Sequence, residues 1–193
     1  FWKQFCIGKE LLLKFGVSPI KYFWINETRF KCYSNSYCFD FNGNRKIYCP
    51  YETDHKWYSN TNKECIQGYN QLLSGGKIIF LTSSLKDVMC LAVLGYQAIA
   101  LQSEMQMPEE VLIKELKSRF VRVVVLYDND FNSKDNPGQM MAGKICDEHT
   151  LINIYIPTEY QSKDISDLIK NYGLDVANKF IKNSLPHGIS ILQ

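Results

Sequence analysis

The sequence predicts an α/β protein: a parallel sheet flanked by helices in the second half, preceded by a small mixed α+β subdomain. Three observations lead to this fold class. Apolar runs alternate with helical patterns from residue 77 onward. One of these runs, Val121–Tyr127, has the composition of a buried parallel strand. The composition changes at Ser74-Gly75-Gly76, which is typical of a loop or boundary. We therefore expect two domains, residues 1–75 and residues 76–193.

The second half divides into regularly alternating elements. The expected strands are Lys77–Leu81, Gln97–Leu101, Val121–Tyr127 and Leu151–Ile156. The expected helices are Ser84–Leu94, one that opens at Pro108, Gln139–His149, Asp164–Asn171 and Leu174–Asn183. Gly95 stands where a helix usually ends, and proline is favoured in a first helical turn. Such alternation implies right-handed crossovers and a parallel sheet of about four strands with helices on both faces.

The first half has a different pattern. Phe1–Phe15 is expected to be a helix, with Pro19 ending that region. Beyond it, aromatic residues alternate with Asn, Gly and Ser around short strand-like pieces such as Arg45–Tyr48. This pattern predicts a mixed subdomain with long loops.

Composition limits the function classes. A net charge of +2 gives no strong overall attraction to nucleic acid, so a basic surface has to come from local arrangement. No apolar run approaches the length of a membrane span. Seven cysteines without a Cys-x-x-Cys pair favour a reduced, cytoplasmic protein, and the spacing of Cys32, Cys38 and Cys49 does not fit zinc ribbons or fingers. The chain begins at Phe1, and we expect it to be a fragment of a larger polypeptide.

The strongest chemical signal is Asp128-Asn129-Asp130, directly after the apolar run. The carboxyl ends of parallel strands form the edge of the sheet where ligands bind. Two adjacent carboxylates repel each other unless a cation lies between them, and Mg²⁺ is usually held by one or two carboxylates together with substrate phosphates. The alternative is an ordinary polar turn, since Asp and Asn are common there.

Three motifs in order resemble the TOPRIM domain shared by bacterial-type primases, topoisomerases and some nucleases. The first is Lys77–Asp87, the second is Asp128 with Asp130, and the third is the segment 163–167, Lys-Asp-Ile-Ser-Asp. The resemblance covers roughly residues 77–175. It implies that Mg²⁺ or Mn²⁺ is held by carboxylates from all three motifs. These are Asp87, Asp128, Asp130, Asp164 and Asp167.

One departure concerns the first motif, which in the family reads apolar strand, Glu-Gly-x-x-Asp. Here Ser83 stands in the place of the glutamate and Ser84 in the place of the glycine. The family glutamate is credited with acid–base work or metal support. Glu104 follows the neighbouring strand and is our candidate to supply that carboxylate, the alternative being a solvated loop acid.

The segment before the first TOPRIM strand is similar to that of bacterial-type primases. Lys56–Asn62 and Ile66–Tyr69 resemble the basic, aromatic, Asn-containing stretch and the turn that follows it, and Asn136-Pro137-Gly138 is similar to phage-encoded primases. The resemblance implies contacts with triphosphate and template. The candidates are Lys56, Trp57, Asn60, Arg45, Lys46, Lys63 and Lys86. Each lysine can instead be a solvated surface residue, and Trp57 can instead be a core residue.

The resemblance therefore implies the RNA polymerase core of a phage-type DNA primase. Its expected partners are a single-stranded DNA template, ribonucleoside triphosphates and a replicative helicase, fused or separate. Two alternatives stay open. One is a TOPRIM nuclease, against which Ser83 counts, and the other is a degenerate TOPRIM module that binds DNA or a replisome partner, which Ser83 favours.

Overall fold

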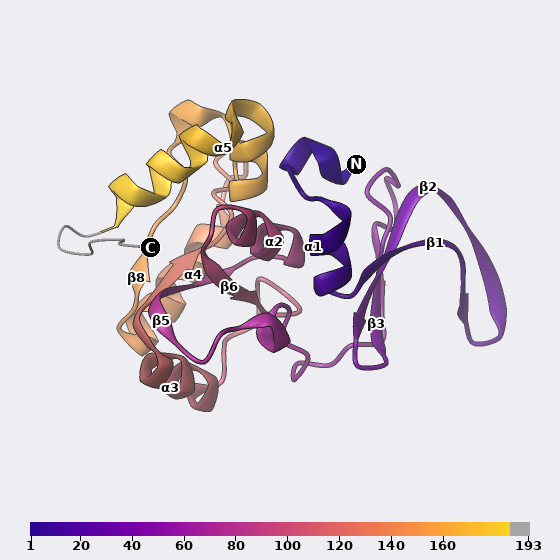
Figure 1. Cartoon of the computed structure of the whole chain (residues 1–193), viewed down its shortest axis with the longest axis horizontal. Helices are drawn as coiled ribbons and strands as arrows, with labels where there is room; N and C mark the ends of the chain where they lie inside the picture. The colour runs from indigo at the N-terminus through magenta and orange to yellow at the C-terminus, as the bar shows by residue number, and fades with distance from the viewer. Residues whose placement is uncertain (186–193) are drawn as a thin grey trace. The chain divides into compact units, whose positions relative to one another are not determined.

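The computed structural model describes residues 1–185, without the side chains of residues 33 and 34, and the chain divides into two compact units (Figure 1). The first unit comprises Phe1 and Gly8–Cys65. The second comprises Trp2–Ile7 and the chain from Ile66 onward. Residues 66–75 therefore pack with the second unit, and the domain boundary between residues 75 and 76 stays a prediction. Within residues 1–185, every helix is too short or too polar to span a bilayer.

The first unit is built on an antiparallel sheet of four strands in the order β1-β2-β3-β4. The strands are β1 (Val17–Ile25), β2 (Thr28–Phe41), β3 (Asn44–Tyr48) and β4 (Trp57–Ser59), and helix α1 (Lys9–Lys14) precedes them. Both residues of each tight turn, Asn26-Glu27 and Asn42-Gly43, have positive φ. Such two-residue turns match the twist of the flanking strands. Asn42-Gly43 is a sequence signal for this hairpin.

The expected helix over Phe1–Phe15 is wrong. The structure has a 3₁₀ helix, η1 (Trp2–Phe5), and then the separate short helix α1. Cys6 lies between them with φ of 59°, a left-handed conformation that cannot continue a right-handed helix. Pro19 lies inside β1, at the edge of the sheet, where a missing amide hydrogen is tolerated. In place of short strands and long loops, β1 and β2 form a long hairpin of nine and fourteen residues.

The second unit contains the predicted parallel sheet, with strand order β6-β5-β7-β8. Its strands are β5 (Gly76–Thr82), β6 (Gln97–Ala100), β7 (Phe120–Leu126) and β8 (Ile152–Asn153). Its helices are α2 (Leu85–Val93), α3 (Glu110–Arg119), α4 (Pro137–His149) and α5 (Ile165–Ser184), with 3₁₀ turns η2 (Tyr69–Gln71) and η3 (Thr158–Tyr160). Gly173, with φ of 84°, interrupts α5, so the two predicted C-terminal helical segments are confirmed.

Helices cover both faces of this sheet, as predicted. On one face Ile79, Leu81 and Val125 pack with Leu116 of α3 and Ile145 of α4 in one buried cluster. On the other, α2 packs against α5, and α5 against η1 (Figure 1). A strand covered on both faces has no solvent side, which explains why β7 is an unbroken apolar run towards its end.

Gln67 attaches the segment before β5 to this sheet. Its backbone exchanges two hydrogen bonds with Ala100, of 2.8 and 2.9 Å. Its buried side chain donates to the Leu101 carbonyl and accepts from the Leu85 amide at 3.3 Å. The end of β6 and the start of α2 are thereby fixed at the edge of the sheet that carries the acidic residues.

Candidate metal and active site

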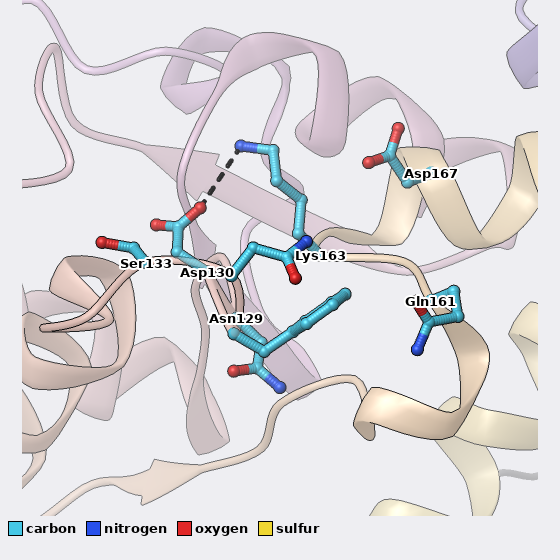
Figure 2. A pocket seen from close by; sticks show the side chains of 8 residues that line it. Asn129, Asp130, Ser133, Gln161, Lys163 and Asp167 are labelled. Carbon is cyan, nitrogen blue, oxygen red and sulfur yellow. Dashed lines mark ion pairs between the residues drawn. The ribbon is translucent and has the colours of Figure 1, made fainter.

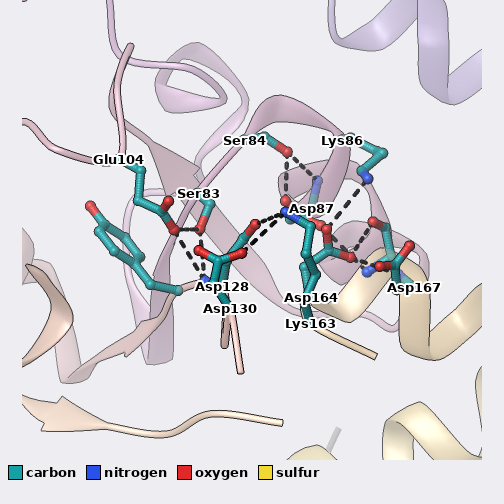
Figure 3. A network of polar contacts seen from close by, with 12 residues as sticks. Ser83, Ser84, Lys86, Asp87, Glu104, Asp128, Asp130, Lys163, Asp164 and Asp167 are labelled. Carbon is teal, nitrogen blue, oxygen red and sulfur yellow. Dashed lines mark hydrogen bonds and ion pairs between the residues drawn. The ribbon is translucent and has the colours of Figure 1, made fainter. Parts of the chain in front are cut away.

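The acidic residues predicted for the site lie at the carboxyl edge of the parallel sheet of the second unit (Figure 3). β7 ends at Leu126, and Asp128 and Asp130 follow almost at once. β5 ends at Thr82, and Asp87 lies in the first turn of the helix that follows. Since neighbouring parallel strands end at the same edge, segments far apart in the sequence meet there.

Two groups of carboxylates lie close enough to share a cation, and Asp128 belongs to both. The first group is Asp87, Asp128 and Asp164, and the second is Glu104, Asp128 and Asp130. Within each group, one oxygen of each residue lies within 4.8 Å of the others. Among the described residues Asp167 is in neither group, although it lines the adjoining cavity. The structure thus brings together five of the six predicted acids.

Helix N-caps hold two of these acids in place. Ser84 caps α2: its hydroxyl accepts from the Asp87 amide at 3.3 Å and donates to the Asp87 carboxylate at 2.5 Å. Asp164 is itself the cap of α5, accepting from the Asp167 amide at 2.6 Å and from the Ser166 hydroxyl at 2.5 Å. The positive end of a helix favours negative charge nearby. Both helices therefore fix and stabilise carboxylates at the sheet edge.

Burial and mutual repulsion shift the pKa values of these groups. Burial, followed by the Asp164 charge, raises the pKa of Asp87 to about 8 and that of Asp128 to about 6. Burial also opposes the ionisation of Asp164, but Lys86, 3.5 Å away, and hydrogen bonds at the helix cap lower its pKa. In the buried pair, the pKa of Asp164 therefore lies below its ordinary value and that of Asp87 above it, so Asp164 ionises more readily than Asp87.

A divalent cation fits this arrangement. Asp128 Oδ1 is buried and has no hydrogen-bond partner among the residues that the structure describes. An unsatisfied buried acceptor is costly, and a metal ion would satisfy it. Carboxylate oxygens are the ligands that Mg²⁺ and Mn²⁺ prefer. The residues present therefore suit the metal predicted from the sequence, with Asp128 as the ligand common to both groups.

Glu104 lies directly against Ser83, the residue that we predicted to stand in the place of the TOPRIM glutamate. The Ser83 hydroxyl donates to Glu104 Oε1 at 2.7 Å. The Asp128 amide is directed at both, 3.1 Å from Ser83 Oγ and 3.2 Å from Glu104 Oε1. Gly138 permits this approach, because a Cβ there would collide with the Asp128 carbonyl and lie 2.9 Å from Glu104 Oε1. A carboxylate thus reaches the site from the loop after β6.

Sequence reasoning missed the residues that shape the Asp128–Asp130 loop. Asn136 donates to Asn129 Oδ1 at 2.8 Å and accepts from the Asp130 amide at 2.8 Å. The Asn129 side chain donates to the Ile156 carbonyl at 2.8 Å, and its amide donates to the Lys163 carbonyl at 2.7 Å. The middle residue of Asp-x-Asp therefore joins three loops. Asn136, just before the proline that opens α4, was the available signal in the sequence. Asparagine tolerates positive φ, and the structure has φ of 39° at this residue.

Four predicted template-binding residues of the first unit lie on opposite faces of its sheet. Trp57 stacks on Tyr48 with ring centroids 4.2 Å apart, and the Lys46 ammonium lies 4.8 Å from the Trp57 centroid. Arg45 and Asn60 line a cavity of about 670 Å³ on the other face. Successive residues of a strand point to opposite faces, which separates Arg45 from Lys46. One nucleic-acid strand on one face would not contact both sets.

The remaining predicted cations have different settings. Lys56 and Lys63 are exposed and flank β4. Lys86 is not a surface residue: its side chain is 19% exposed and its ammonium lies beside Asp164 and 5.2 Å from the Phe5 ring centroid. Lys86 therefore acts as a counter-ion within the acidic cluster.

A cavity of about 410 Å³ adjoins the acids (Figure 2). Its lining consists of Asn129, Asp130, Phe131, Asn132, Ser133, Gln161, Lys163 and Asp167. The volume is in the range of small-molecule sites and the walls combine an aromatic ring, amides and charges. The cavity is therefore large enough to take part of a nucleotide beside Asp130.

Solved structures that resemble this chain include DNA primases, at low sequence identity. The DnaG primase catalytic domain bound to single-stranded DNA matches with a TM-score of 0.67 at 12% identity, over 95% of this chain and 72% of that chain. The Aquifex aeolicus primase, with zinc-binding and RNA polymerase domains, gives 0.63 at 15%, over 94% and 54%. The primase fragment of the bacteriophage T7 primase-helicase gives 0.53 at 16%, over 92% and 70%. No protein-family model and no curated protein matches the sequence.

This chain has the fold of a primase catalytic core. The predicted fold class is confirmed: a TOPRIM domain of parallel strands flanked by helices, with a smaller subdomain before it. The predicted resemblance to bacterial and phage primases is confirmed at the level of the fold.

The stability of the metal-free protein should fall as pH rises. The folded pKa values of Asp87 and Asp128, about 8 and about 6, lie above the ordinary value of 3.8. The folded state therefore binds protons that the unfolded chain has released, and this contribution, complete below about pH 4, is lost as pH rises through both values. Melting temperatures in a chelator, from about pH 5 to about pH 9, measure the slope.

Asp87→Asn should flatten the upper part of that curve, because the amide cannot titrate. Saturating Mn²⁺ should flatten it in the unsubstituted protein, since a bound cation replaces the protons. Equal slopes in the two proteins would show that Asp87 does not titrate in this range.

Proposed function

We propose that this chain is the catalytic core of a DNA primase, which synthesises short RNA primers on single-stranded DNA by metal-dependent nucleotidyl transfer. The observation that carries this proposal is the position of Asp128, shared by two carboxylate groups at the carboxyl edge of a sheet with the primase fold. Fold alone would not suffice, because one fold can host several activities. The carboxylate arrangement adds chemistry that suits phosphoryl transfer.

The reaction joins the 3′ oxygen of a primer to the α-phosphorus of a ribonucleoside triphosphate and releases pyrophosphate. Bound Mg²⁺ or Mn²⁺ would supply positive charge to the attacking oxygen and to the leaving group. One cation would be held on the side of helices α2 and α5, by Asp87, Asp128 and Asp164. A second would be held on the other side of Asp128, by Asp128 together with Asp130 and Glu104. Asp167 would face the adjoining cavity.

Glu104 is proposed to do the work of the missing motif glutamate. Its hydrogen bond from Ser83 places a carboxylate beside the position that the family pattern assigns to that residue. Neighbouring parallel strands β5 and β6 present their loops at the same edge, so the exchange preserves the location of the charge. The short serine side chain leaves room for the longer one.

The proposed partners are a single-stranded DNA template, ribonucleoside triphosphates and a replicative helicase, with the cytoplasm as location. Support comes from solved neighbours with this fold: one is bound to single-stranded DNA, and another is a fragment of a primase-helicase. Ser83 favours one alternative function, a TOPRIM module that binds nucleic acid without catalysis.

Primer synthesis on single-stranded DNA with labelled ribonucleotides tests the proposal. With Mg²⁺ or Mn²⁺, oligoribonucleotides should form, and Asp128→Asn/Asp130→Asn should abolish them because both carboxylate groups lose Asp128. Circular dichroism of the double variant controls for folding. Intact binding of metal and DNA without product would favour the binding module, and cleavage of the DNA would favour a TOPRIM nuclease.

Glu104→Gln should reduce kcat for primer synthesis by about a hundredfold or more if the carboxylate takes part in acid–base work. The amide keeps an oxygen for the Ser83 and Asp128 hydrogen bonds, so the fold should be unaffected. Ser83→Glu in the Glu104→Gln background returns a carboxylate to the motif position and should restore part of the rate. Unchanged activity in Glu104→Gln would leave Glu104 with a structural role.

Two matched double variants determine which face of the first unit binds template. Lys46→Ala/Trp57→Ala removes an ammonium and a 42% exposed ring that lie together. Arg45→Ala/Asn60→Ala changes the other face, where Arg45 pairs with Asp40 at 3.2 Å and Asn60 accepts from the Arg45 amide at 2.6 Å. We expect the first pair to weaken binding of single-stranded DNA by about tenfold or more, by loss of stacking and charge.

Fluorescence anisotropy with a labelled oligonucleotide at several salt concentrations measures both affinities. The salt dependence should also decrease in the Lys46→Ala/Trp57→Ala protein, because one phosphate contact is lost. A larger loss in Arg45→Ala/Asn60→Ala would place the template on the cavity face instead.

A further inference from the structure

Lys163 places a positive charge between the two aspartates that follow β7. Its ammonium contacts Asp128 Oδ2 and lies 3.7 Å from Asp130 Oδ1 (Figures 2 and 3). Both aspartates belong to the group that also contains Glu104. The lysine therefore occupies the side of Asp128 that faces one of the two candidate cation positions.

The backbone of this lysine is fixed by hydrogen bonds, whereas its side chain is about half exposed. The Lys163 carbonyl accepts from the Asn129 amide at 2.7 Å, which ties it to the middle of the Asp-x-Asp loop. On either side, Ser162 and Asp164 are buried, and Ser162 accepts from Asn171 of α5 at 2.9 Å. The Lys163 side chain itself is 47% exposed. A fixed backbone and a half-exposed side chain with several rotatable bonds allow the ammonium to move into solvent while the backbone keeps its place.

The ammonium and a divalent cation would compete for the same oxygens. A metal ion held by Asp128 and Asp130 has to lie about 2 Å from each ligand oxygen, inside the region that the ammonium now fills. At such short separations a single and a double positive charge repel each other appreciably even with solvent screening. Occupation of that position by one of them therefore excludes or weakens the other.

We propose that Lys163 is a positioning residue that stands in for the metal: it holds Asp128 and Asp130 together until a divalent cation displaces it. The inference rests on the proposed function for the identity of the cation, but it concerns a step that precedes template and nucleotide. Without an internal cation, the carboxylates of Asp128 and Asp130 would repel each other, which would move their side chains apart. With one, the ligands are already in place when the metal arrives.

Lys163→Met tests this role, because the thioether side chain has similar length and no charge. Mn²⁺ binding to the full chain, without nucleotide or DNA, is followed by the paramagnetic resonance of free Mn²⁺. The dissociation constant should fall by about tenfold in Lys163→Met, since both competition and repulsion are removed. Lys163→Arg keeps the charge and should stay close to the unsubstituted protein.

Thermal melting supplies a second readout, in which Lys163→Met should lower stability although it raises metal affinity. Metal-free Lys163→Met should melt below the unsubstituted protein, because Asp128 and Asp130 have lost their counter-ion, and Mn²⁺ should raise its melting temperature by more. A merely structural lysine would lower stability and metal affinity together. Lys163→Gln, which keeps a hydrogen-bond donor, serves as the second neutral variant if the methionine variant does not fold without metal.

The matched control is Lys114→Met, which removes one charge from the same unit at a surface pair with Glu110. Its Mn²⁺ affinity should be unchanged. Unchanged or weaker Mn²⁺ binding in both neutral Lys163 variants would overturn the inference. Asp128→Asn reports on the metal site itself: if it leaves Mn²⁺ binding intact, the proposed function fails, whatever the result for Lys163.

Discussion

Repulsion among buried carboxylates is the constraint on which the rest of the second unit depends. Asp87, Asp128 and Asp164 come from three separate segments, and all three are buried within reach of one ion. Burial favours the neutral acid, and each additional charge raises the free energy of the others. Such a cluster persists only where helix caps, lysines, protons or metal ions compensate it. In the metal-free protein, helix caps, lysines and bound protons provide this compensation.

The three carboxylates are compensated to different extents, and this difference determines which of them most needs a cation. Asp164 receives the cap hydrogen bonds and the Lys86 ammonium, so it stays charged. Asp87 accepts from the Ser84 hydroxyl and, at 3.4 Å, from the Ser166 amide, while burial and the Asp164 charge raise its pKa to about 8. Asp128 has one oxygen on Lys163 and the other without a partner among the described residues. The site is thus most in need of positive charge at Asp128, where both groups meet.

The sequence predicts the parallel half of the fold because its signals are local. The predicted strands there are largely apolar runs, and Gly95, Pro108 and Pro137 mark boundaries between strands and helices, so periodicity identifies them without knowledge of their partners. The prediction for the aromatic first half was wrong because its strands can be identified only from the strands with which they pair. β2 pairs with both β1 and β3, and polar residues such as Asp40 alternate along it. The left-handed turn at Cys6 is a tertiary effect that no propensity marks.

The site shows the same division between local and distant information. Asp128 and Asp130 follow from one strand end, and Asp87 and Asp164 follow from the motif order. The pairing of Glu104 with Ser83 rests on strands β5 and β6 being neighbours, which the sequence only implies through resemblance. Asn136 and Lys163 escaped notice as site residues because they act on the Asp128–Asp130 loop from other segments. Their contribution becomes visible only when hydrogen bonds are traced in space.

The proposed exchange of a motif glutamate for Glu104 has a physical requirement that the structure meets. A carboxylate can move from one strand's loop to the next only if the vacated position becomes small and the new path is clear. Ser83 meets the first condition and donates a hydrogen bond that orients the incoming group. Gly138 meets the second, because any side chain there would strike Glu104 or the Asp128 backbone. Serine at 83 and glycine at 138 therefore belong to one arrangement. A degenerate motif in sequence can in this way coexist with an intact set of charges in space.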